Sequence, residues 1–345
     1  MATNKRLIKS NDDAAPVVPT SFNTVLWDGT GSSQSITGVG FNPEFIITKN
    51  RDLAVGANVF DVIRDNFTLY TSLTNAEDNF SGSIDISSAN TDGFDLIGDS
   101  SSFNSNGKRY VAWCWKAGGA AVSVANGIGT SSITQSANVA AGFSITNYTG
   151  SVTGANKTIP HGLSTAPSMV IIKDRDWEVP NWFIWHQGLS GGDYYLTFTT
   201  AAQTQNSAVF SSAPTSSVVN LGIDSGVGDR TDRYIAYCFA EVAGFSKISS
   251  YVGNNGNPIT IDVGFEPAFI MIKNTNTAGP GWNMYDNKRL DSTSGYNIFA
   301  NSSNAEADYS SLFQMTSSGF TVTGVNTNTN FNNDTFIYMA FANQF

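Results

Sequence analysis

A twelve-residue segment that returns twice, VGFNPEFIITKN at residues 39–50, constrains the fold more than any other feature of the chain. Residues 263–274, VGFEPAFIMIKN, match it at eight of twelve positions, and residues 162–174, GLSTAPSMVIIKD, form a looser copy. Each copy has a proline six positions before a lysine, and proline suits the entry to a strand because it lacks a backbone donor. The residues between them are mostly apolar on both faces, which predicts a central strand, buried on both sides and used three times.

Three further blocks recur in the same order around these strands. One begins at Tyr110 (YVAWCWKAG), Tyr234 (YIAYCFAE) and Phe336 (FIYMAFAN), and it follows the repeated lysine by 61, 61 and 63 residues. An opening block contains Trp27-Asp28-Gly29, Tyr148-Thr149-Gly150 and Tyr251-Val252-Gly253, and a middle block reads NVFDV, NWFIW or GWNMY. This fixed order predicts tandem repeats, each about 100 residues long.

The spacing of the blocks predicts five segments. They are an extended N-terminal docking arm (1–20), a first β repeat (21–117), a Gly/Ala/Ser-rich linker (118–141), a second β repeat (142–243) and a third β repeat (244–345). Alternating apolar residues leave room for an added strand pair within the linker. Because hardly any spacer separates the last two repeats, we expect them to form a rigid pair.

The composition is typical of short strands joined by polar turns. Charged residues make up 13% of the chain, whereas soluble domains average about 25%, so much of the surface must be Ser, Thr, Asn and Gly. No long segment shows a helical period with caps. We therefore expect an all-β fold of three tandem β-sandwich repeats. Its structural core is expected to contain Phe45, Ile47, Cys114, Ile171, Cys238, Phe269 and Met271.

Charge and hydropathy argue against several functional classes. The net charge is −10 and the pI about 4.5, with acids scattered singly, which argues against nucleic-acid binding. No apolar run approaches the roughly 20 residues of a membrane span, and the N-terminus lacks the apolar centre of a secretory signal. Cys114 and Cys238 take equivalent places in separate repeats, so we expect buried thiols and no disulfide.

Candidate chemistry is sparse, and we expect neither a cofactor nor an enzymatic activity. Residues 188–192 fit the pattern G-x-S-x-G, but they fall in a predicted β turn and not in a strand-to-helix elbow. Asp224, Asp229 and Asp232 crowd a glycine-containing loop, where they would either hold calcium or form a solvated loop. A pair of carboxylates for glycoside hydrolysis stays open, because the separation that matters is spatial.

Three aromatic residues are the candidates for ligand binding. Trp177 has no counterpart in the other repeats and lies in a loop, with Tyr194 and Tyr195 further along the chain. An exposed tryptophan there would serve either as a platform for stacking a sugar or as a cap over a neighbouring unit. The sequence leaves both alternatives open.

The remaining repeated side chains are expected to be structural. Trp182 and Trp282 fall where the first repeat has Val59, which places them in the core. Lys49, Lys173 and Lys273 end the repeated strand, so we expect each to extend its charge to solvent along its aliphatic stem.

The repeated blocks resemble a β domain of marine bacteriophage tail-fibre-like virion proteins. The segments that carry the resemblance are GVGFNPEFIITKNRD, YVAWCWKAGG, GFSITNYTG, HGLSTAPSMVIIKDRD, YIAYCFAEVAGFSKISSY and FIYMAFA, and it extends over residues 21–345. The first repeat departs from the others in lacking the middle tryptophan, and the third in lacking the cysteine. The resemblance implies an extended, commonly trimeric β fibre or spike, and it supplies no catalytic or ligand-binding residues.

A virion protein that acts as a fibre or spike in attachment to the host surface is what the resemblance predicts. The alternatives are a capsid decoration or head-fibre protein without a receptor, and a glycan-binding or polysaccharide-degrading tailspike. The expected partners are other virion proteins through the arm, two further copies in a homotrimer, and a host-surface glycan or receptor. No nucleic-acid partner and no membrane insertion are expected.

Overall fold

The computed structural model describes residues 21–65, 67–80, 84–86, 90–289, 296–309 and 311–343, and the predicted arm lies outside them. Within these residues the regular structure is all strand, so the expected all-β class is confirmed. This part of the chain contains no helix that is long and apolar enough to cross a membrane.

We group the strands into three units by their order along the chain. The first unit contains β1 (Phe22–Asp28), β2 (Gln34–Thr37), β3 (Phe45–Asn50), β4 (Asn58–Asp61), β5 (Phe67–Tyr70), β6 (Asp78–Asn79), β7 (Ile84–Asp85), β8 (Gly93–Leu96) and β9 (Arg109–Trp115). The second contains β10 (Val122–Ser123), β11 (Ser131–Asn138), β12 (Phe143–Thr149), β13 (Lys157–Pro160), β14 (Met169–Asp174), β15 (Phe183–His186), β16 (Tyr194–Thr197), β17 (Thr204–Gln205), β18 (Val218–Leu221) and β19 (Arg233–Phe239). The third contains β20 (Ser246–Val252), β21 (Gly256–Asp262), β22 (Phe269–Asn274), β23 (Asn283–Asp286), β24 (Tyr296–Phe299), β25 (Ala307–Asp308), β26 (Phe313–Thr316), β27 (Gly319–Gly324) and β28 (Thr335–Phe341).

Each unit has a large sheet in which equivalent strands follow the same order. That order is β1-β9-β3-β4-β5-β6 in the first unit, β12-β19-β14-β15-β16-β17 in the second and β20-β28-β22-β23-β24-β25 in the third. A smaller sheet accompanies each one: β2-β8-β7, β13-β18 and β21-β27-β26. The strand neighbours in these sheets are antiparallel. In the first unit, Ile46 of the large sheet and Phe94 of the small one belong to a single core, as in a β-sandwich.

The strands predicted from the repeated segment, β3, β14 and β22, lie inside the large sheets and are buried along their whole length. Their side chains alternate between two cores. In β3, Phe45 and Ile47 enter a core shared by all three units, whereas Ile46 enters the core between the two sheets of its own unit. Each large sheet therefore has an apolar layer on both faces, which explains the unbroken apolar run.

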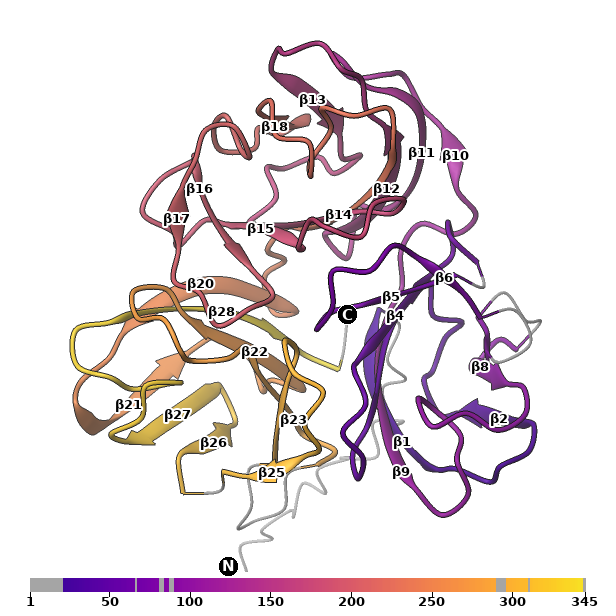
Figure 1. The fold of residues 1–345 in the computed structure, drawn as a ribbon. Helices are drawn as coiled ribbons and strands as arrows, with labels where there is room; N and C mark the ends of the chain where they lie inside the picture. Colours follow the sequence, from indigo (N-terminus) through magenta and orange to yellow (C-terminus); the bar gives the residue numbers. More distant parts are fainter. Residues whose placement is uncertain are drawn as a thin grey trace, which may run out of the picture.

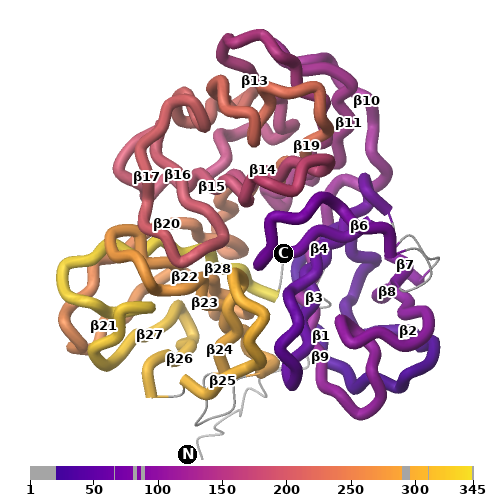
Figure 2. The backbone as a smooth tube through the Cα atoms, in the orientation of Figure 1, coloured from indigo at the N-terminus to yellow at the C-terminus, as the bar shows by residue number. Residues whose placement is uncertain are grey.

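The shared core lies where the three large sheets meet (Figure 1). Its centre is aromatic: the ring centroids of Phe45 and Phe143 are 5.5 Å apart, and those of Trp115 and Phe341 are 5.7 Å apart. Figure 2 shows the backbone of the units closing around this centre, each unit beside the other two. Burying one such side chain contributes about 1.5–3 kcal/mol, so the shared core is a large part of what holds the units together.

Three equivalent backbone hydrogen bonds close the ring. The amides of Glu77, Gln203 and Glu306 donate to the carbonyl oxygens of Arg175, Thr275 and Arg51, each at 2.9 Å. They join the first unit to the second, the second to the third and the third to the first. The compact ring differs from the extended fibre that the resemblance implies, and the second and third units form no separate pair.

The segment that was predicted as a linker adds two strands to the second unit. β10 pairs with β11, and β11 pairs with β12 along the edge of the large sheet. The strand pair for which the sequence leaves room is thus present, and residues 118–141 contribute Ile133 to the core of the second unit.

The expectation that Trp182 and Trp282 lie in the core is confirmed, since both are 1% exposed, but the counterpart assigned to them in the first repeat is wrong. Val59 pairs with Ile47 on β3, just as Ile184 pairs with Ile171 on β14, so Val59 is equivalent to Ile184. The counterpart of the buried Trp182, two positions before Ile184, is therefore Ala57 and not Val59.

The lysines were expected to reach solvent, but Lys49, Lys173 and Lys273 are 0% exposed. Their Nζ atoms donate to backbone carbonyl oxygens, those of Val55 (2.5 Å), Asp174 (2.7 Å) and Pro280 (2.8 Å) respectively. Burial lowers the pKa of each lysine to about 8. Loops that follow the strand turn back over its end, so the ammonium groups find acceptors inside the protein.

Candidate functional site

The loop that follows the repeated strand is built in the same way in all three units. In the first unit Asn50 Oδ1 accepts the amides of Asp52 and Leu53, both at 2.9 Å. Asp174 Oδ1 accepts those of Asp176 (2.9 Å) and Trp177 (3.0 Å), and Asn274 Oδ1 accepts those of Asn276 (2.9 Å) and Thr277 (3.0 Å). The side chain at the end of the strand therefore fixes the turn, and Trp177 occupies the place of Leu53 and Thr277.

Trp177 is half-buried, and an arginine covers its ring. Arg230 Cζ lies 4.3 Å from the ring centroid of Trp177, within the range of a cation–π contact. Arg230 also pairs with Asp232, at 2.5 Å between Nε and Oδ2. Asp176, Glu178 and Val179 next to Trp177 are exposed. This loop and the one that carries Arg230 thus present one aromatic ring, a guanidinium and two carboxylates at the surface of the second unit.

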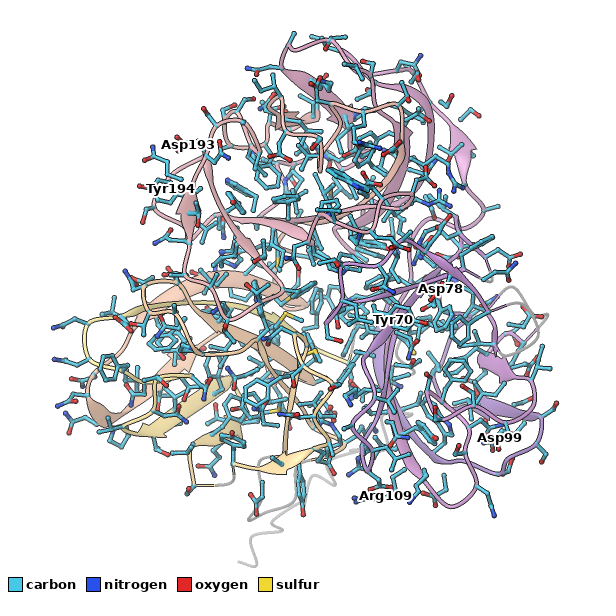
Figure 3. The ribbon with its side chains drawn as sticks, in the orientation of Figure 1. Tyr70, Asp78, Asp99, Arg109, Asp193 and Tyr194 are labelled. Carbon is cyan, nitrogen blue, oxygen red and sulfur yellow. The ribbon has the colours of Figure 1, made fainter. Side chains whose placement is uncertain are left out.

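Tyr194 and Tyr195 do not join Trp177 in one platform. Tyr194 packs against the shared core and Tyr195 against the core of the second unit, because adjacent residues of β16 face opposite sides. The Tyr195 ring lies edge-on to Phe183 at 5.4 Å. Asp193 and Tyr194 lie at the outer rim of the second unit (Figure 3).

The three aspartates that were proposed as calcium ligands have separate partners. Asp229 Oδ1 pairs with Lys157 Nζ at 2.7 Å, and Asp232 pairs with Arg230. Asp224 Oδ1 accepts the amide of Gly226 at 2.7 Å. Among the described residues there is no group of three or more His, Cys, Asp or Glu side chains placed to hold a metal ion.

Asp174 is the residue of this site that the sequence interpretation did not single out. It is 0% exposed, and its Oδ2 is buried without a hydrogen-bond partner. Burial raises the pKa of its carboxyl to about 6, although the amides of Asp176 and Trp177 act in the opposite direction. The copies of the strand gave a signal that was available in the sequence: they end in Lys-Asn, Lys-Asp and Lys-Asn.

The other candidate groups lie in the interior. His186, before the G-x-S-x-G segment, is buried; its Nδ1 accepts the amide of Gly188 (2.9 Å), so Nε2 donates to the Tyr338 carbonyl (3.2 Å). Burial lowers the pKa of His186 to about 4. Cys114 and Cys238 are buried, free thiols, and burial raises the pKa of Cys238 to about 12. All seven residues expected in the structural core are less than 9% exposed.

One family model matches residues 19–344, which include every strand from β1 to β28. The chain belongs to the family DUF7483, a domain of unknown function. No curated protein matches the chain significantly. The family match extends across all three units and the strands between β9 and β12.

Within this DUF7483 chain, the residues that recur in all three units lie apart from those found in the second unit alone. The recurring residues build the two core layers and the turn after the repeated strand. Trp177 and Arg230 lie outside both layers, in loops of the second unit alone. We take the surface formed by residues 174–180 and 222–232, here called the second-unit loop surface, as the candidate functional site.

Proposed function

We propose that the protein is a bacteriophage virion component that acts in attachment to the host surface, and that the second-unit loop surface contacts the receptor. The repeated blocks that resemble tail-fibre-like proteins are the origin of the first half of this proposal. The observation that supports the second half is the Trp177–Arg230 pair, a surface ring and guanidinium that neither other unit carries at the equivalent loop.

The chemistry of this surface suits a sugar. An indole face stacks on the apolar face of a sugar ring, and neighbouring charged groups hydrogen-bond its hydroxyls. Asp176 is already held by Arg233, whose amide donates to Asp176 Oδ2 at 2.7 Å. Since Arg230 is likewise paired with Asp232, the exposed Glu178 is the group of this loop surface that would meet the hydroxyls of a glycan.

The test is a competition assay in which the purified protein blocks adsorption of the phage to host cells. Trp177→Ala should abolish the competition, and Leu53→Ala, at the equivalent loop of the first unit, should leave it unchanged. Equal competition by both variants would remove the second-unit loop surface from the proposal. Failure of the wild-type protein to compete would contradict attachment itself.

A second part of the proposal concerns the arm, residues 1–20, as the segment that docks on other virion proteins. Its charge order and Pro-Val-Val-Pro segment suit an extended peptide that orders on contact. A chain that begins at residue 21 should fail to join virions while keeping its folded spectrum. Normal incorporation of this shortened chain would place the attachment surface on the units.

A homotrimer stays a proposal, and the structure sharpens how to test it. Apolar faces of the three units pack against one another within a single chain, and three equivalent junctions close the ring. Any trimer must therefore use other surfaces. Light scattering that gives the mass of one 36.8 kDa chain at micromolar concentration would contradict a homotrimer formed by the chain alone.

Capsid decoration without a receptor is the runner-up. The compact ring favours it over a long fibre, because the three units form one body and not an extended rod. Labelling the protein on virions distinguishes the two: decoration predicts many copies on the head, and attachment predicts a few copies on the tail or at fibre tips.

A further inference from the structure

The second unit carries a carboxyl group where the first unit carries an amide that donates a hydrogen bond. In the first unit Asn50 Nδ2 donates to the hydroxyl of Tyr110 at 3.2 Å, and that hydroxyl faces the carbonyl oxygen of Ser101 at 3.4 Å. In the second unit Tyr234 takes the place of Tyr110, and its hydroxyl donates to the carbonyl oxygen of Ser225 at 2.6 Å. Asp174 stands where Asn50 stands, since it lies opposite Tyr234 in the sheet as Asn50 lies opposite Tyr110.

A carboxyl group can imitate the amide only when it carries a proton. Asp174 Oδ1 already accepts two backbone amides, so Oδ2 takes the position of the amide nitrogen. Since the Tyr234 hydroxyl gives its hydrogen to Ser225, it offers Asp174 an acceptor and no donor. A protonated Oδ2 completes the arrangement seen in the first unit, and an ionised Oδ2 is left buried without a donor.

The positive charge of Lys173 favours an ionised Asp174, but burial and the negative charge of Asp232 outweigh it. Lys173, on the same strand, directs its Nζ to the backbone carbonyl of Asp174, and Arg230 is paired with Asp232. Asp232 itself adds negative charge, and Tyr234 and Tyr148 from β19 and β12 complete the surroundings. Burial raises the pKa of Asp174 from 3.8 to about 6, a difference that corresponds to about 100-fold in proton affinity.

We infer that Asp174 and Tyr234 form a proton-dependent switch that holds the loop at residues 222–232 in mildly acidic solution and loosens it at neutral pH. In the closed state the Asp174 carboxyl donates to the Tyr234 oxygen, and the Tyr234 hydroxyl donates to Ser225. When Asp174 releases its proton to water, the hydroxyl turns to the new carboxylate. Ser225 then loses its hydrogen bond, and no covalent bond is made or broken.

The loosened loop carries the residue that covers Trp177. Arg230 belongs to residues 222–232, and its guanidinium lies over the indole ring. Opening of the loop uncovers the Trp177 ring at neutral pH and covers it again in acid. The switch concerns the loop itself and does not depend on the proposed role in attachment.

Hydrogen exchange of the full-length chain tests the switch directly. Exchange of the amides in residues 222–232, divided by their intrinsic rates, should accelerate as the pH rises from about 5 to about 7.5, by up to about 100-fold. The equivalent loop of the first unit, residues 98–107, carries the amide arrangement and should show no such change. Equal, pH-independent protection of both loops would overturn the inference.

Two matched substitutions should exchange the pH sensitivity of the two loops. Asp174→Asn copies the side chain of the other units, so it should fold and make residues 222–232 insensitive to pH. Asn50→Asp should transfer the sensitivity to residues 98–107. A pH response that persists unchanged in Asp174→Asn would assign it to another group and contradict the switch.

Discussion

The junctions between units differ in charge although their backbone contacts are equivalent. The junctions that the first unit makes carry buried ion pairs: Arg175 with Glu77 and Arg51 with Glu306, both at 2.8 Å. At the junction of the second and third units the corresponding backbone bond joins Gln203 and Thr275, which carry no charge. Since all three backbone bonds measure 2.9 Å, the shared core and the backbone set the ring, and ion pairs are not required for it.

The same contrast between charged and neutral junctions appears among the buried side chains at the ends of β4, β15 and β23. Asp61 and Arg64 form a fully buried pair at 2.6 Å, and Asp61 also accepts the hydroxyl of Tyr237 from the second unit. Asp286 and Arg289 repeat this pair at 2.6 Å, with Trp113 of the first unit as the donor. The second unit has His186 in the equivalent place, hydrogen-bonded to a backbone carbonyl of the third unit. A neutral group can thus fill the same place in the ring.

The largest loss of stability should follow from breaking one buried ion pair. Asp61→Ala leaves the Arg64 guanidinium buried without its carboxylate and removes the acceptor of Tyr237, so we expect a loss of about 3–5 kcal/mol. Chemical denaturation measures the change. The double variant Asp61→His with Arg64→Leu imitates the second unit, which has His186 and Leu189, and it should lose less than the single variant. A single variant as stable as the wild type would show that the pair has no structural role.

The next largest loss of stability should follow from truncating a side chain in the core that the charged and neutral junctions share. Ile47, Ile171 and Met271 are 3–7% exposed and enter the same core from three units. Truncation of any one to Ala should cost about 2–5 kcal/mol and lower the midpoint of the whole chain, not of one unit. Urea denaturation followed by both fluorescence and circular dichroism tests this. A change below about 0.5 kcal/mol at one of the three positions would indicate that its unit does not share the core.

The neutral junction should lose stability in mild acid because of His186. Its pKa is 6.5 in an ordinary environment and about 4 when buried, so the unfolded chain takes up a proton first as the pH falls. Stability contributed by neutral His186 is present above pH 6.5 and is lost between 6.5 and about 4, by up to about 3 kcal/mol. Measuring the free energy of unfolding against pH for the wild type and for His186→Gln isolates the contribution of His186. Identical slopes for the two proteins would contradict it.

The smallest loss of stability should come from the Arg175–Glu77 ion pair at the first–second junction. Arg175→Thr converts the first–second junction to the composition of the second–third junction, where Thr275 takes that place. The Arg175 side chain is 7% exposed, but its backbone carbonyl keeps the bond to Glu77, so we expect a loss of about 1–3 kcal/mol. Thermal unfolding of this variant beside Thr275→Ala gives the comparison. A loss as large as that of Asp61→Ala would make the Arg175–Glu77 pair essential to the ring.

The sequence predicts the strands well and their assembly poorly, for a physical reason. The distance from proline to lysine and the two apolar faces identify β3, β14 and β22 as buried central strands. An apolar face indicates burial but does not identify what covers it, so the second face of these strands could not reveal the ring. The lysine prediction failed in the same way, because the acceptors of Lys49 Nζ include Ser303 of the third unit, which is 254 positions away.

The candidate site was predictable only in part. Trp177 stood out in the sequence because the other copies lack it, and the structure places it in a surface loop. Its cover by Arg230 and the buried Asp174 beneath the loop depend on residues 222–232 folding over the strand end. The change from Asn to Asp between copies is visible in the sequence, but its meaning requires Tyr234 opposite it in the sheet.

Calorimetric unfolding of the full chain tests most directly whether the three units form one body around a shared core. One core predicts a single transition whose calorimetric enthalpy equals the van't Hoff enthalpy, because removing any unit exposes the faces of the other two. Two or more transitions, or a van't Hoff enthalpy far below the calorimetric value, would show that the units unfold independently and would contradict the closed ring.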